Sequence, residues 1–107
     1  MPRTIRKILR ELKKGLTQIY GDQLNAVYLF GSYARGEGRI PDSDIDVMVV
    51  LKDDFNRREV ETRSIEFVAS LCLEYDAVIM CKFITAKKYS DSKMPFMINV
   101  RRDAVAI

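Results

Sequence analysis

The stretch LNAVYLFGSYARG, residues 24–36, joins an apolar segment to a glycine-serine turn and organises the rest of the chain around it. Residues 24–30 are rich in aliphatic and aromatic side chains, which predicts a β-strand. The run that begins at Gly31 predicts a turn that opens a short helix, and backbone N–H groups at such a junction favour phosphate. Gly31 has no side chain to keep a phosphate away. Ser32 can add a hydroxyl donor, and Arg35 can neutralise phosphate oxygens further out.

A second predicted strand follows after a loop and spans residues 44–51, DIDVMVVL. Residues 47–51 are apolar on both faces, which predicts a central place in a sheet. Asp44 and Asp46 lie two residues apart on this strand, so their carboxylates project from the same face. Two anions held side by side need a cation, and Mg²⁺ prefers oxygen ligands. Strand-end solvation or turn capping also explains such a pair, but the phosphate-binding turn upstream favours a metal site.

A third carboxylate, that of Asp76, opens the next predicted strand, residues 76–84. If the second and third strands are neighbours, Asp76 reaches the same end of the sheet as Asp44 and Asp46. Three carboxylates can seat two metal ions, an arrangement that stabilises the entering and leaving oxygens of an in-line phosphoryl displacement. The chain contains no histidine, which excludes a histidine general base, a histidine triad and a His-ligated zinc site.

Helices are predicted on both sides of these strands. Residues 2–20 place apolar side chains at spacings of three and four, with a basic opposite face that a solvated surface explains. Residues 56–74 predict a second long helix, in which Asn56 is the N-cap and Glu59 completes a capping box. One or two short helices are expected before an apolar end at residues 105–107. This order of elements predicts an α/β (α+β) fold.

The composition of the 107 residues narrows the function classes. One domain, residues 1–107, is expected from this length. The 18 Lys and Arg against 15 Asp and Glu give a net charge of +3, which tolerates an anionic ligand but does not predict nucleic acid as the main partner. No apolar run approaches the roughly 20 residues that a membrane span needs. Cys72 and Cys81 lack CxxC spacing and an upstream secretory signal, which predicts reduced core thiols in a cytoplasmic protein.

Three runs together resemble a known family. GSYARG at residues 31–36, SDIDV at residues 43–47 and DAVI at residues 76–79 resemble the minimal nucleotidyltransferases of the DNA polymerase beta-like superfamily. The signature of that superfamily is a GSxARG turn, an SDxD strand and a third aspartate on a later strand. The resemblance covers nearly the whole chain and implies a small mixed β-sheet with helices.

The resemblance also implies a role for each candidate site residue. Gly31 and Ser32 correspond to the pair that holds a triphosphate. Asp44 and Asp46 correspond to ligands shared between two metal ions, with Mg²⁺ expected. Asp76 corresponds to the third metal ligand and is the candidate general base.

An activity and a partner follow from the same resemblance. The expected reaction is attack of an acceptor hydroxyl on the α-phosphorus of a nucleoside triphosphate, with ATP as the donor by family analogy. So small a chain shows no second domain to hold the acceptor, and the family is often paired with HEPN-domain toxins that receive AMP on a tyrosine. The chain is then an antitoxin of such a pair. The alternatives are a non-catalytic nucleotide-binding antitoxin that neutralises its partner stoichiometrically and a small nucleic-acid binder. The donor base, the acceptor and the oligomeric state stay open.

Overall fold

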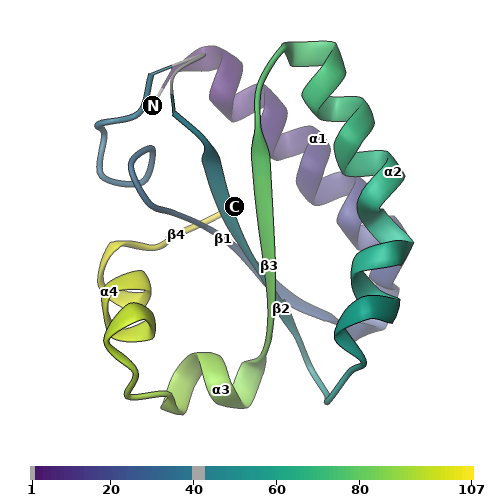
Figure 1. The fold of residues 1–107 in the computed structure, drawn as a ribbon, viewed down its shortest axis with the longest axis vertical. Helices are drawn as coiled ribbons and strands as arrows, with labels where there is room; N and C mark the ends of the chain where they lie inside the picture. Colours follow the sequence, from purple (N-terminus) through teal and green to yellow (C-terminus); the bar gives the residue numbers. More distant parts are fainter. Residues whose placement is uncertain (1, 40–42) are drawn as a thin grey trace.

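A computed structural model describes residues 2–39 and 43–107 of the chain. The strands of these residues form one mixed sheet in the order β3-β2-β1-β4 (Figure 1). β1 runs antiparallel to both β2 and β4, whereas β2 and β3 are parallel. The strands are β1 Leu24–Phe30, β2 Ile45–Leu51, β3 Ile79–Thr85 and β4 Val105–Ala106.

Helices lie on both faces of the sheet (Figure 1). The long helices α1 and α2 pack against one face, and α4 packs against the other. This arrangement confirms the expected α/β (α+β) fold class with a mixed sheet. The helices are α1 Arg3–Tyr20, the short 3-10 helix η1 Gly21–Gln23, α2 Arg57–Tyr75, α3 Ala86–Asp91 and α4 Pro95–Asp103.

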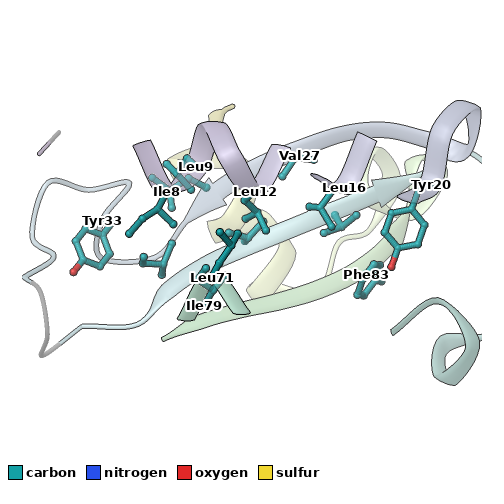
Figure 2. Close-up of a cluster of buried hydrophobic side chains, with 14 of the residues drawn as sticks. Ile8, Leu9, Leu12, Leu16, Tyr20, Val27, Tyr33, Leu71, Ile79 and Phe83 are labelled. Atoms are coloured by element: carbon teal, nitrogen blue, oxygen red, sulfur yellow. The ribbon is translucent and has the colours of Figure 1, made fainter. Parts of the chain in front are cut away.

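The larger part of the core lies between the sheet and the two long helices (Figure 2). α1 contributes Ile8, Leu12 and Leu16 to it, and these side chains are fully buried. The helices approach closely at Gly15, because a Cβ atom at that position would lie 2.0 Å from the ring of Phe67 in α2. The predicted amphipathic helix thus turns its apolar face to the core, as its spacing indicates.

The ends of α2 show one prediction confirmed and one wrong. The side chain of Asn56 accepts a hydrogen bond from the Glu59 N–H at 3.0 Å, which confirms the N-cap. Asp76, however, does not open a strand: it is the C-cap of α2, in the left-handed conformation with φ 49° and ψ 51°. Because Asp76 and Ala77 still bond back to the carbonyl of Cys72, the third strand begins only at Ile79.

The short helix predicted after β1 is absent, and residues 31–36 form turns instead. The Arg35 N–H donates to the Gly31 carbonyl at 3.2 Å, and the Glu37 N–H donates to the Ser32 carbonyl at 2.8 Å. Gly31 and Gly36 both adopt positive φ, 76° and 77°, which a right-handed helix does not allow. The turn is therefore closed by its own backbone bonds and carries no helix dipole.

The apolar end of the chain completes the sheet. Val105–Ala106 pairs with Leu29 and Tyr28 of β1, and the Ile107 N–H donates to the Val27 carbonyl at 3.0 Å. No helix in the described part of the chain combines the length and the apolar character of a membrane span.

Candidate active site

The site is built where β1 ends and β2 begins, around a contact between Gly31 and Asp46. The β1–β2 register pairs Phe30 with Asp46, so the next residue, Gly31, comes to lie against the Asp46 side chain. A Cβ atom at residue 31 would stand 2.3 Å from Asp46 Oδ2. The φ of 76° adds a second requirement for glycine at this position. Because Gly31 has no side chain, the Asp46 carboxylate can lie against the turn.

Asp46 lies on the strand β2, and Asp44 directly precedes that strand instead of opening it as predicted. Ile45 between them is fully buried in the core beneath α1 and α2, and successive side chains of a strand point to opposite faces. The Asp44 side chain is exposed, whereas that of Asp46 is partly buried. The Asp46 carboxylate thus lies on the face that α4 covers further along.

The electrostatics of this pair fit a hard cation. Burial raises the pKa of Asp46 above its usual value, and the neighbouring charge of Asp44 raises it further. Lys82 and Arg35 lower the pKa of Asp46, but the net direction stays upward. Burial and the charge of Asp44 thus outweigh the two cations in their effect on the pKa of Asp46. A Mg²⁺ ion, which takes one or two carboxylates and completes its shell with water and phosphate, suits this donor set.

Arg35 connects the turn to the end of α4. Its guanidinium lies 3.1 Å from the Glu37 carboxylate and 3.8 Å from the carboxylate of Asp103, the last residue of α4. The same side chain is one of the two cations that act on Asp46. The partly buried Ser32 stands between Gly31 and Arg35 in the turn. The turn thus brings Gly31 and Arg35, two of the predicted phosphate-binding residues, close to Asp46.

Asp76 is the predicted site residue that the structure leaves apart from the others. Its side chain is exposed at the C-cap of α2, and on β3 the residue paired with Asp46 is Met80. Asp76 is not among the charges that shift the pKa of Asp46. Within residues 2–39 and 43–107, no group of three or more His, Cys, Asp or Glu side chains is arranged to hold a metal ion. The structure therefore brings together Gly31, Arg35, Asp44 and Asp46.

Two sets of neighbours were missed by the sequence reasoning. Lys82 lies on β3 opposite Met48, on the same face as Asp46, and the alternation of β3 could have indicated it. On α4, Phe96, Asn99 and Asp103 are spaced by three and four residues, which places them on one helical face. These three residues line a cavity with Gly31 and Arg35.

Sequence comparison relates most of the chain to one family. The family model described as "Nucleotidyltransferase domain" matches residues 5–100. "Putative protein adenylyltransferase MJ0141" of Methanocaldococcus jannaschii is 37% identical over 73 residues, which make up 68% of this chain and 72% of that protein. "Putative protein adenylyltransferase MJ1305" of the same organism is 41% identical over 54 residues, half of this chain but 36% of that protein.

Solved structures share the fold at lower sequence identity. A "toxin-antitoxin with AMP-PNP" crystal structure superposes with a TM-score of 0.62 and 21% identity, covering 91% of this chain and 69% of that chain. A crystal structure of "a putative nucleotidyltransferase from Sulfolobus solfataricus" gives a TM-score of 0.58 and 22% identity, covering 99% and 86%. At these identities the comparison shows a common fold, with the same mixed sheet and helices.

Proposed function

Because the chain belongs to the nucleotidyltransferase domain family, we propose that it transfers AMP from ATP to a hydroxyl group of a partner protein. The protein adenylyltransferase names of the relatives from Methanocaldococcus jannaschii support a protein acceptor. The observation that carries the proposal is the Asp46 carboxylate lying against the Gly31 turn, with the charge of Asp44 close enough to raise the pKa of Asp46.

The residues of the site have distinct tasks in this reaction. The turn at Gly31 and Ser32 holds the triphosphate, and Arg35 neutralises its outer oxygens. Asp44 and Asp46 hold Mg²⁺, which when bound supplies the positive charge that offsets the phosphates and polarises the α-phosphorus. A second ion, implied by the family resemblance, requires Asp76 to join the pair.

The transfer itself is a balanced displacement at phosphorus. The acceptor hydroxyl oxygen forms a bond to the α-phosphorus, the bond from that phosphorus to the bridging oxygen breaks, and pyrophosphate leaves. The hydroxyl proton needs an acceptor, and a carboxylate can take this part in a chain that has no histidine. Asp76, near the end of the sheet where β3 begins, is the proposed acceptor of the proton.

The partner that we propose is a HEPN-domain toxin, which receives AMP on a tyrosine and is silenced by it. Two observations support this. The family resemblance of the GSYARG and SDIDV runs extends to such pairs, and a structure with the same fold is a toxin–antitoxin complex with AMP-PNP. With ATP as donor, the cytoplasm is the compartment in which we propose that the pair acts.

The proposal is tested by label transfer in the presence of Mg²⁺. The purified protein and its proposed HEPN-domain partner are incubated with ATP labelled at either the α- or the γ-phosphate. We expect label on the partner from the α-position only, with release of one pyrophosphate per AMP transferred. Asp46→Asn should reduce the transfer at least about a hundredfold, because the metal loses a charged ligand. Equal labelling by the wild-type protein and by this variant would refute the assignment.

Stoichiometric binding of the partner without turnover is a second candidate function. The position of Asp76 favours it, because the described residues hold two carboxylates together and leave the third at the C-cap of α2. This function predicts that an equimolar amount of protein neutralises the partner with no pyrophosphate released. Catalytic neutralisation by a tenfold smaller amount, with pyrophosphate release, would exclude it.

A further inference from the structure

A cavity of about 220 Å³ lies between the turn after β1 and helix α4. The turn contributes Gly31 and Arg35 to its lining, and α4 contributes Phe96, Asn99 and Asp103. Gly31 also touches the Asp46 carboxylate, so the cavity opens directly beside the site of the phosphates. Its volume is below the roughly 300–1,000 Å³ of pockets that enclose a whole small ligand, so it suits one flat ring system.

The walls of the cavity offer the two kinds of contact that a nucleobase uses. The ring of Phe96 is 49% exposed and packs edge-on against Phe30, with a centroid separation of 5.9 Å and an interplanar angle of 87°. Phe30 thereby fixes the orientation of the Phe96 ring, and Lys82 Nζ lies over one face of that ring, 6.0 Å from its centroid. Bases stack on aromatic faces, so the opposite face is the one that we assign to a base. Asn99 is an exposed side chain with both a hydrogen-bond donor and an acceptor in one plane.

A pair of opposite charges, Arg35 and Asp103, forms part of the cavity lining. Asp103 lies 3.8 Å from the Arg35 guanidinium, which keeps the Arg35 side chain between the turn and α4. A ligand in the cavity therefore meets the paired charges of Arg35 and Asp103, the neutral amide of Asn99 and the aromatic ring of Phe96. That combination suits a base attached to phosphates better than it suits an isolated anion or an apolar side chain.

We propose that this cavity holds the adenine ring of the donor nucleotide, with Phe96 as the stacking residue and Asn99 as the residue that reads the base. The inference rests on the proposed function, because it takes the triphosphate to lie on the Gly31 turn. An asparagine amide oxygen accepts a hydrogen bond from the adenine N6 amino group while its NH₂ donates to N7. Guanine presents the O6 acceptor where adenine has the amino group, so the amide oxygen would face a second acceptor.

Binding measurements with ATP, GTP and inorganic tripolyphosphate, each with Mg²⁺, test this proposal by calorimetry. We expect the wild-type protein to bind ATP about tenfold more tightly than either GTP or tripolyphosphate. Asn99→Ala should weaken ATP binding about tenfold and remove the preference over GTP. Phe96→Ala should weaken ATP and GTP alike, and neither variant should change tripolyphosphate binding. The control is Ile98→Ala, which changes a half-exposed side chain of α4 outside the cavity and should leave all three affinities unchanged.

Several results would overturn the proposal, and they differ from a failure of the proposed function. If the wild-type protein binds ATP and tripolyphosphate equally, the cavity holds no base although the phosphate site stands. If Asn99→Ala keeps the wild-type preference for ATP, Asn99 does not read the base. If the wild-type protein binds neither ATP nor tripolyphosphate, the phosphate site fails as well, and the proposed function fails with it.

Discussion

Asp46 Oδ2 occupies the space that a side chain at Gly31 would take, since a Cβ atom there would stand 2.3 Å away. The end of β1 and the start of β2 are thus joined twice, by the pairing of Phe30 with Asp46 and by the contact of Gly31 with the Asp46 carboxylate. The glycine of the turn thus serves two purposes, because the same missing side chain admits the carboxylate and leaves room for a phosphate.

Comparing Gly31→Ala with a second glycine variant should distinguish the loss of the contact with Asp46 from the cost of backbone strain. A non-glycine residue in the left-handed region costs about 1–2 kcal/mol, so we expect a loss of that size in the free energy of unfolding. Gly36→Ala is the matched control, because Gly36 has φ 77° and nothing within 4 Å of its absent Cβ. Both variants should lose similar stability in urea titrations. Only Gly31→Ala should also lose about a hundredfold in AMP transfer, because it displaces the Asp46 carboxylate. Equal activity of the two variants would show that the contact is irrelevant to the reaction.

Asp46→Asn should make the metal-free protein more stable at neutral pH. Burial and the charge of Asp44 raise the pKa of Asp46, so the folded chain binds this proton more tightly than the unfolded chain does. The corresponding stability is fully present below the unfolded pKa and is lost as the pH rises through the folded pKa. Removing the charge at pH 7 should therefore raise the free energy of unfolding by about 0.5 kcal/mol, a value kept small by solvent screening.

Measuring the stability of Asp46→Asn at acid pH provides a control for the effect expected at pH 7. Near pH 3 the carboxyl is largely protonated in both the folded and the unfolded chain, so the gain from Asp46→Asn should shrink. Urea titrations at the two pH values, without added metal, measure the difference. A loss of stability at pH 7 would mean that the cations Lys82 and Arg35 outweigh burial and the charge of Asp44.

Asp76→Asn tests the third predicted carboxylate. A general base contributes about 10²–10⁴ to a rate, so its loss would be unmistakable. Because we propose Asp76 as the acceptor of the hydroxyl proton, we expect AMP transfer to fall at least about a hundredfold. Stability should hardly change, because asparagine tolerates the left-handed conformation. A fall of less than about tenfold would exclude Asp76, at the C-cap of α2, as the proton acceptor.

Gly15→Ala should weaken the packing of α1 on α2. The added Cβ would lie 2.0 Å from the Phe67 ring, and overpacking of this kind typically costs about 1–3 kcal/mol. Alanine favours a helix over glycine by about 1 kcal/mol, so the net loss should be smaller. In a Phe67→Leu background the same change should become stabilising. Urea titrations of the four proteins give the coupling energy, and additive effects would exclude the contact.

Cys81 should be almost inert in the folded protein. Burial raises the pKa of its thiol to about 12, and the thiolate is the form that alkylating reagents attack. In a Cys72→Ser background, we expect iodoacetamide at pH 8 to modify Cys81 at least about a hundredfold more slowly in buffer than in urea. Equal rates would show that the β3 segment opens readily.

The elements with local signals were predicted well. β1 occupies residues 24–30 as expected, because its apolar run ends at a glycine with positive φ. α1 spans Arg3–Tyr20 because its spacing, with Pro2 before it and Gly21 after it, marks both ends. The third strand was placed three residues early because α2 ends on Asp76, and an aspartate gives a weaker C-cap signal than glycine.

The sequence indicated individual residues of the site but not how the fold places them relative to one another. The Asp44 and Asp46 pair follows from the alternation of a strand, which is a local property. The distance of Asp76 from that pair depends on where α2 ends and on the register of β3 against β2. Asn99 and Phe96 reach the site only because α4 folds back beside the turn after β1, which no local pattern shows.

The pairing of Phe30 with Asp46 affects how strongly the register of β2 against β1 is specified during folding. If β2 paired with β1 one residue out of register, every side chain of β2 would point to the opposite face of the sheet. Asp46 would then be buried in the hydrophobic core between the sheet and the helices α1 and α2. The penalty for that error is several kcal/mol, as for any unpaired charge taken out of water. The shifted register of β2 is therefore much less stable than the native one. Nearly every folded chain should thus carry the Asp46 carboxylate on the sheet face that α4 covers.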